Sequence, residues 1–167
     1  MLWKIFKNIV RTVMEWLLKL FHIEWTKRQW ESFMQFIKFG LVGVTNTVLA
    51  YAINVLVLLA LKNAKLPYDY IIGNLVSFFL SVLWSFYWND KYVFKMESGE
   101  ERTIGKALLK TYVSYGFTGI VLNNILSIIW ISVLEVSKYI APVFNLLLSV
   151  PINFFLNKFW AFKKEEK

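Results

Sequence analysis

The sequence predicts an all-α membrane protein, in which four transmembrane helices form two repeated hairpins behind an amphipathic helix. Composition is the first indication, because 57% of the 167 residues are hydrophobic and only 18% are charged, whereas about a quarter of an average soluble domain is charged. Four long apolar stretches are the second indication, and the distribution of Lys and Arg between them is the third. Aromatic residues, at 19%, suit a chain with many membrane–water boundaries.

The four apolar stretches are long enough to cross a bilayer. A helix of about 20 residues rises about 30 Å, which matches the thickness of the hydrocarbon core. The central parts of the stretches contain no charged residue, and Lys38 and Glu135 lie at their edges. The predicted spans are 39–61, 70–88, 111–134 and 139–157.

The Lys and Arg residues predict how these spans are oriented. Sixteen of the 19 lie before the first span, between the second and third, or after the fourth, and the other connections hold only Lys62, Lys65 and Lys138. Cytoplasmic connections are enriched in Lys and Arg, so both termini and the middle loop are expected to face the cytoplasm. The net charge of +8 therefore indicates topology and an attraction to anionic lipids, and no nucleic-acid partner is expected.

Residues 1–35 are expected to form an amphipathic helix at the cytoplasmic interface. Apolar side chains recur every three or four positions, as on one face of a helix. That face comprises Leu2, Ile5, Phe6, Ile9, Val13, Trp16, Leu17 and Leu20. The helix either lies among the lipid headgroups or packs against the bundle or a partner subunit. His22 is expected at the surface, and because the chain has no cysteine, no metal or cofactor site is predicted.

The second and fourth spans repeat one another at a shift of 68 residues. Each carries a polar residue at every fourth position and closes on an Asn-x-x-aromatic-x-Phe-Lys motif, which we call the first ending (89–95) and the second ending (157–163). The matching positions are Ser77 and Asn145, Ser81 and Ser149, Ser85 and Asn153, and Asn89 and Asn157. Both halves enter and leave on one side, so the sequence predicts parallel repeats joined by the linker 96–106.

These polar positions form a stripe along each helix, because residues four apart lie nearly above one another. In a membrane the stripes are expected to face protein or water. The serines allow two interpretations, which are close packing between helices and a path for a polar ligand. The asparagines favour a ligand or network role, because an amide is costly to bury without partners.

The endings combine aromatic anchors with lysines. Tyr92, Phe94, Trp160 and Phe162 are expected as interfacial anchors. Lys38 and Lys110 are expected near the starts of the first and third membrane helices, where free N–H groups and the helix dipole favour a phosphate. Lys91 and Lys158 would add charge from the other two helices.

At these residues the sequence resembles the GtrA-like family of small four-helix membrane proteins. The matching segments are KFGLVGVTNT (38–47), Gly73-Asn74, NDKYVF (89–94) and NFFLNKFWAF (153–162), and the resemblance covers about residues 36–163. Residues 164–167 remain as a charged tail. The first ending departs from the family pattern, because Ser85 stands where Asn is usual and Asp90 where a basic residue is usual.

The resemblance implies a function in a bacterial inner membrane. A polyprenyl-phosphate-linked monosaccharide would be flipped from the inner to the outer leaflet, to supply glycosylation of surface polysaccharide or teichoic acid. The phosphate would dock at Lys38, Lys91, Lys110 and Lys158. The sugar would meet a polar track formed by Asn46, Asn74, Ser85, Asn89, Asn145, Asn153 and Asn157.

Other functions are weighed against this one. The alternative is that the chain is a non-transporting subunit that stabilises a membrane glycosyltransferase. A membrane glycosyltransferase is also expected as a partner of a flippase. Proton-coupled export is disfavoured, because the spans hold no carboxylate to carry the proton. An enzyme is not expected, since paired carboxylates and a glycine-rich phosphate loop are missing from the sequence. Four helices scarcely enclose a path for a sugar, so a homodimer is expected.

Overall fold

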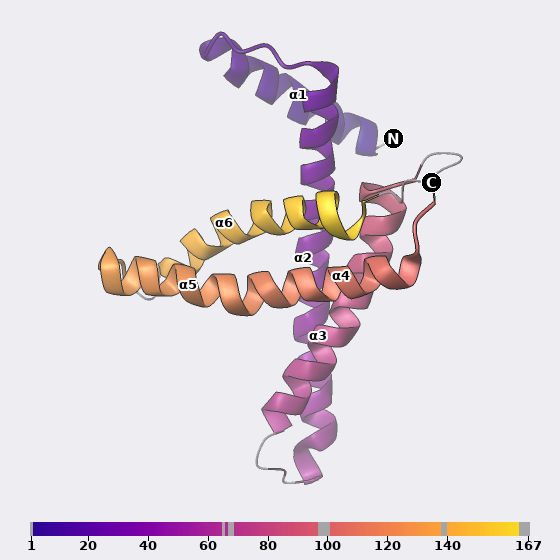
Figure 1. Cartoon of the computed structure of the whole chain (residues 1–167), viewed down its shortest axis with the longest axis vertical. Coiled ribbons are helices and arrows are strands. Elements are labelled where there is room, and N and C mark those ends of the chain that lie inside the picture. Colours follow the sequence, from indigo (N-terminus) through magenta and orange to yellow (C-terminus); the bar gives the residue numbers. More distant parts are fainter. Residues whose placement is uncertain (1, 65, 67–68, 97–100, 138–139, 164–167) are drawn as a thin grey trace. The chain divides into compact units, whose positions relative to one another are not determined.

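The computed structural model describes residues 2–64, 66, 69–96, 101–137 and 140–163, and it confirms the all-α fold class (Figure 1). The described helices are α1 (Leu2–Leu20), α2 (Lys27–Leu61), α3 (Asp69–Trp88), α4 (Ile104–Gly116), α5 (Asn123–Ile128) and α6 (Ala141–Leu156). Lys65 and Lys138, the linker residues 97–100 and the predicted tail 164–167 lie outside the described residues.

Four helical segments of the described chain are long and apolar enough to cross a membrane, so the protein is a multi-pass membrane protein. They are Lys27–Ala64, Ile71–Val93, Ile104–Val133 and Val143–Ala161. The first and third segments begin before the predicted spans, because their helices start in the polar sequence that precedes each apolar stretch. The second and fourth segments extend beyond the last residues of the predicted spans, into the first and second endings.

Several of these segments contain π-helical turns. Helix α3 ends in η2 (Asn89–Val93) and α6 ends in η5 (Asn157–Ala161), while η3 (Phe117–Leu122) and η4 (Ile129–Val133) flank α5. In both endings a phenylalanine N–H donates to the carbonyl of the asparagine five residues earlier, at 2.8 Å in each case, which is the closure of a π turn. The two endings therefore repeat one another in backbone geometry as well as in sequence.

The chain divides into an amino-terminal unit, Met1–Ile37, and a membrane unit, Lys38–Lys167. In the amino-terminal unit, α1 is shorter than the predicted segment 1–35 and residues 27–35 belong to α2. A capping box explains the start of α2, because the Thr26 N–H donates to Gln29 Oε1 at 2.8 Å and the Gln29 N–H donates to Thr26 Oγ1 at 3.3 Å. The reversal before it uses His22 with a positive φ of 53°.

The apolar face of α1 is exposed within the amino-terminal unit. Trp16 is 61% exposed, and Ile9 and Val13 are more than half exposed. A cleft of about 640 Å³ separates α1 from the start of α2. Its lining is basic, acidic and aromatic, with Lys7, Arg11, Lys19 and Lys27, Glu15, Glu24 and Glu31, and Trp25 and Trp30. The apolar face remains available to a membrane or to a partner.

In the membrane unit, α2 and α3 lie side by side as the first hairpin (Figure 1). The Asn54 side chain donates from Nδ2 to Asn74 Oδ1 at 2.9 Å, and Trp84 Nε1 donates to Thr45 Oγ1 at 3.3 Å. A Cβ at Gly73 would lie 3.0 Å from Asn54 Nδ2. Glycine at this position therefore leaves room for the Asn54 side chain in the contact between the two helices.

The second hairpin places α6 against α5 and η3. Asn145 of α6 donates from Nδ2 to the carbonyl of Asn123 at 3.2 Å and to Ser127 Oγ at 2.7 Å. An amide of α6 thus joins the two arms of this hairpin, as Asn54 and Asn74 join the arms of the first. Such interhelical hydrogen bonds satisfy polar groups that lipid cannot.

An aromatic core joins the two hairpins at the endings. Phe94 and Phe162 stack with ring centroids 4.7 Å apart, and Phe154 lies 5.9 Å from Phe94 and 5.5 Å from Phe39. Phe94 and Phe162, which were expected as interfacial anchors, are instead 6% and 4% exposed and belong to this core. Tyr92 and Trp160 remain exposed. Residues two apart in a helical turn point about 200° apart, which separates the two kinds of aromatic residue.

Candidate functional site

The polar stripes of α3 and α6 face protein, as the sequence predicted. Ser77, Ser81, Ser85 and Asn89 are all buried on α3, and Asn145, Asn153 and Asn157 are buried on α6 and η5. Ser149 is half-buried. Ser85, Asn89 and Asn157 are completely inaccessible to solvent. The two stripes therefore look into the protein rather than toward acyl chains.

A third buried polar stripe lies on α4 and η3 and was not expected as part of the site. Thr111 and Ser114 are buried on α4, which packs against both α3 and α6, and Thr118 is buried on η3, which continues α4. Two tyrosines of α4 reach α3, because Tyr115 Oη lies 2.8 Å from Ser85 Oγ and Tyr112 Oη donates to the Phe79 carbonyl at 2.7 Å. Hydroxyl residues spaced three and four apart were the sequence signal for this stripe.

The hydroxyl groups of the stripes are mostly satisfied by their own helices. Ser77 donates to the Asn74 carbonyl at 3.0 Å and Ser81 to the Phe78 carbonyl at 3.2 Å. Thr111 and Thr118 donate in the same manner to the carbonyls of Ala107 and Ser114. Small side chains bonded in this way let helices approach, so these residues fit the packing interpretation.

Three of the buried asparagines differ from most of the stripe hydroxyls, because each keeps its side-chain acceptor unused; Ser114 Oγ is the one buried stripe hydroxyl that also lacks a partner among the described residues. Asn89 Nδ2 donates to Ser85 Oγ at 3.1 Å, and Asn157 Nδ2 donates to the carbonyl of Asn153 at 2.8 Å and to its Oδ1 at 3.0 Å. The Oδ1 atoms of Asn89, Asn145 and Asn157 are buried and have no hydrogen-bond partner among the described residues. A buried polar group left unpaired costs about 1–3 kcal/mol, so these three oxygens favour a donor supplied from elsewhere.

The lysines of the site fall into two groups, one at each ending. Lys38 Nζ donates to the Tyr92 carbonyl and Lys110 Nζ donates to the Trp160 carbonyl, both at 3.4 Å. Tyr92 and Trp160 occupy matching positions in the two repeats. Lys91 belongs to the first ending beside Tyr92, and Lys158 belongs to the second beside Trp160. The structure therefore associates Lys38 with the first ending, which contains Lys91, and Lys110 with the second, which contains Lys158.

The expectation that Lys38 and Lys110 lie at helix starts is wrong. Helix α2 begins at Lys27 and α4 at Ile104, so both lysines lie inside their helices. The favourable field of a helix start extends over the first turn only. Free backbone N–H groups therefore contribute nothing at these lysines, and a phosphate there would be held by side chains.

The lysines within the endings lie against aromatic rings. Lys91 Nζ lies 5.3 Å from the centroid of the Tyr87 ring and donates to its hydroxyl at 3.0 Å. Lys158 Nζ lies 5.4 Å from the centroid of the Phe154 ring. A cation over an aromatic face is stabilised by the ring quadrupole. Each ending thus holds positive charge next to an aromatic surface.

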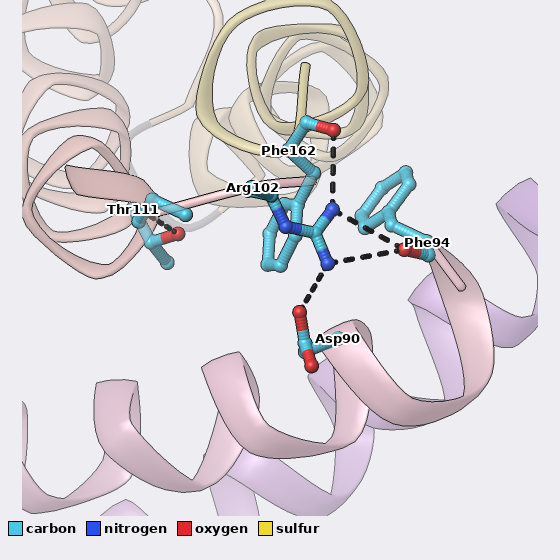
Figure 2. A network of polar contacts seen from close by, with 6 residues as sticks. Asp90, Phe94, Arg102, Thr111 and Phe162 are labelled. Carbon is cyan, nitrogen blue, oxygen red and sulfur yellow. Dashed lines mark hydrogen bonds and ion pairs between the residues drawn. The ribbon is translucent and has the colours of Figure 1, made fainter. Parts of the chain in front are cut away.

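Arg102, in the linker between the hairpins, joins both endings and was not expected as a site residue (Figure 2). Its side chain is only 5% exposed. Nη1 donates to the carbonyl of Phe162 at 3.1 Å and to that of Phe94 at 3.3 Å. Nη2 forms an ion pair with Asp90. The guanidinium carbon lies 4.8 Å from the centroid of the Phe162 ring.

The ion pair between Asp90 and Arg102 explains why the first ending tolerates an acidic residue where the family pattern has a basic one. Asp90 matches Lys158 at the shift of 68 residues, so the charge at this position is reversed between the repeats. The ion pair with Arg102 neutralises that reversal. Asp90 is recognisable from the sequence as an acidic residue at a position that is usually basic, but its connection with the arginine in the linker was not predicted.

Two predicted members of the polar track lie elsewhere. Asn74 is exposed on α3 and bonded to Asn54 of α2, a residue that was not expected in the site. Asn46 is half-buried on α2, with its Oδ1 buried and unpartnered among the described residues. Neither residue lies on the buried faces of α3, α4 and α6 that carry the stripes.

The comparison with known families agrees with the extent of the membrane unit. The model of the family "GtrA/DPMS, transmembrane domain" matches residues 38–165, so the chain belongs to this family. The match begins at the first residue of the membrane unit. No curated protein and no solved structure shows significant similarity to the chain.

Proposed function

We propose that this member of the GtrA/DPMS family flips a polyprenyl-phosphate-linked monosaccharide from the inner to the outer leaflet of a bacterial inner membrane. The observation that carries the proposal is the joining of buried amide stripes to lysine groups at the two endings. A sugar needs hydrogen-bonding partners inside the membrane, and a phosphate needs positive charge where it enters. The isoprenoid chain needs neither, because it stays in the lipid.

The endings supply the site for the phosphate. Each presents two lysines beside an exposed aromatic residue, Tyr92 in the first and Trp160 in the second. Exposed Tyr and Trp are typical of the membrane–water interface, so the lysines would lie at the depth of lipid headgroups. In the proposed orientation this interface is the cytoplasmic one, where the lipid-linked sugar is made.

The amides supply partners for the sugar. From Asn145 to Asn157, twelve residues of helix rise about 18 Å, more than half of the hydrocarbon core. The free Oδ1 atoms of Asn89, Asn145 and Asn157 would accept hydrogen bonds from sugar hydroxyls. We propose no catalysis by the chain and no proton coupling, so consumption of the lipid outside, by a membrane glycosyltransferase, would draw the movement forward. A homodimer would close the path.

A second function is favoured by a different observation. The stripe hydroxyls bond to their own helices and the apolar face of α1 is exposed, as a subunit that packs against a glycosyltransferase would require. Such a subunit would stabilise or localise the enzyme and would move no lipid. Transport by the pure protein separates the two functions.

The test is transport in proteoliposomes that contain the purified chain and a fluorescent undecaprenyl-phosphate-glucose analogue. Flipping exposes the label to a membrane-impermeant quencher. We expect the chain to flip the lipid, and Lys158→Gln to abolish flipping while Lys62→Gln, at the other side of the membrane unit, retains it. Absence of flipping by the folded, unmodified chain, together with stabilisation of a membrane glycosyltransferase when the two are mixed, would support the subunit function instead.

A further inference from the structure

Arg102 uses only part of its hydrogen-bonding capacity. Its Nη1 and Nη2 atoms contact the carbonyls of Phe94 and Phe162 and the carboxylate of Asp90 (Figure 2). Its Nε atom is buried and has no hydrogen-bond partner among the described residues. A charged donor left without an acceptor in the protein interior is costly. The position therefore favours a second acceptor beside Asp90.

The unused donor lies on the edge of the guanidinium that recognises oxyanions. The N–H of Nε and one N–H of Nη2 point the same way in the planar group, so they present two parallel donors. Carboxylates and phosphates bind such an edge with two oxygens at once. Asp90 contacts this edge through Nη2 alone, which leaves the edge half occupied.

Asp90 is the more accessible member of the pair. Its side chain is 36% exposed, whereas that of Arg102 is 5% exposed. An anion that approaches from the side of Asp90 would meet the Nε–Nη2 edge, and the carboxylate would have water to turn toward. Repulsion between two anions on one guanidinium would drive Asp90 away.

From this geometry we propose that the Nε–Nη2 edge of Arg102 binds the phosphate of the lipid substrate, and that Asp90 occupies the edge when no phosphate is bound. The inference rests on the proposed function and names the residue that recognises the phosphate. The lysines of the two endings attract the anion, and Arg102 donates hydrogen bonds to two of the phosphate oxygens.

Binding of a phosphate at Arg102 would affect both repeats, because Arg102 contacts both endings. The same guanidinium holds the Phe94 carbonyl of the first ending and the Phe162 carbonyl of the second, and it lies over the Phe162 ring. Exchange of Asp90 for a phosphate would therefore change the partner of a group that contacts both endings.

The test measures binding of farnesyl phosphate to the purified full chain in nanodiscs, with farnesol and inorganic phosphate as separate ligands. Asp90→Asn removes the competing charge and keeps the shape of the side chain, so we expect farnesyl phosphate to bind about tenfold more tightly. Arg102→Lys keeps the charge but removes the planar edge, so we expect binding about tenfold weaker or worse. Asp69→Asn, the same change at the other end of α3, is the matched control and should leave binding unchanged.

The double variant Asp90→Asn/Arg102→Lys makes the test specific. If Asp90 acts by occupying Arg102, its replacement no longer tightens binding once the edge is gone. A merely structural ion pair predicts the opposite pattern, in which Asp90→Asn lowers the unfolding temperature and leaves binding unchanged or weaker. That result would overturn the proposal. If Arg102→Lys does not fold, the direction of the Asp90→Asn change decides the matter alone.

The ligands and the transport assay separate this inference from the proposed function. Tight binding of farnesyl phosphate, with weak binding of farnesol and of inorganic phosphate, assigns the site to a lipid phosphate. Equal binding of inorganic phosphate would assign it to a free anion and contradict the inference. If the chain flips the lipid-linked sugar normally and both variants bind like the unmodified chain, only the inference fails. If the chain neither binds farnesyl phosphate nor transports, the proposed function fails.

Discussion

Phe94 and Phe162 stack at the centre of the molecule's two repeats, with ring centroids 4.7 Å apart and planes 24° apart. Each is the last aromatic residue of its ending, and each donates its backbone N–H to the asparagine that opens the same ending. The repeats therefore meet through equivalent residues. This contact joins the two endings, each of which contains a lysine group, through one shared core.

Replacement of Phe162 by alanine tests the contribution of that core. We expect the free energy of unfolding to fall by about 3 kcal/mol, because a large buried aromatic group is removed. Phe159→Ala is the control, since Phe159 lies in the same ending and is exposed, and it should change the free energy of unfolding little. Reversible denaturation in detergent micelles gives both values, and equal losses would contradict the packing described.

The contact between Gly73 of α3 and the Asn54 side chain of α2 leads to a second prediction. An alanine there would place Cβ 3.0 Å from Asn54 Nδ2 and disturb the bond from Asn54 to Asn74. We expect Gly73→Ala to lower the free energy of unfolding by about 1–2 kcal/mol through the lost hydrogen bond and the clash. Gly43→Ala, where no atom lies within 4 Å of the added Cβ, should leave stability unchanged or raise it. A reversed order of the two variants would count against the first hairpin.

The exposed apolar face of α1 predicts insertion into lipid headgroups. The chain has no cysteine, so a single cysteine at Val13 or at Lys7 carries an environment-sensitive dye at one site. We expect the dye at position 13 to emit at shorter wavelength and to be quenched by brominated acyl chains in anionic liposomes, because this face would lie about 5–10 Å deep. The dye at position 7 should remain in water. The same emission at both positions would favour docking onto a partner subunit.

The difference between the asparagines and the serines predicts different losses of transport. Asn157 keeps a buried acceptor unused, whereas Ser77 is satisfied by the Asn74 carbonyl. We expect Asn157→Ala to reduce the initial rate of flipping at least about tenfold, corresponding to roughly 1.4 kcal/mol in the barrier, and Ser77→Ala to change it less than about twofold. Quencher accessibility in proteoliposomes measures both rates. Similar losses for the two variants would assign the whole stripe to packing.

Much of this arrangement follows from the sequence because the period of its polar residues is strict. Serines and asparagines at every fourth position have to share a helix face, and in a membrane that face has to be covered by protein. The 68-residue shift likewise predicted that Asn89 and Asn157 would hold equivalent places, and their π turns confirm it.

The remaining features depend on contacts that a linear pattern does not contain. Asp90 lies in the first ending and Arg102 follows twelve residues later in the linker, and only folding brings the guanidinium between the two endings. Phe94 and Phe162 resemble interfacial anchors in sequence, but they are core residues because their rings stack on each other. Helix α2 begins at Lys27 because Thr26 and Gln29 cap it, a local signal that the apolar pattern of the membrane stretch concealed.

The claim on which this account depends is that the lipid-linked sugar passes along the buried stripes and docks at the endings. Photocrosslinking with an undecaprenyl-phosphate-glucose analogue that carries a diazirine on its sugar tests it most directly, with the modified residues located by mass spectrometry. We expect labels within residues 85–95 and 145–163, reduced by an excess of the unmodified lipid. Labels confined to exposed apolar residues such as Val48, Leu56 and Leu59 of α2, with no competition by the unmodified lipid, would contradict it.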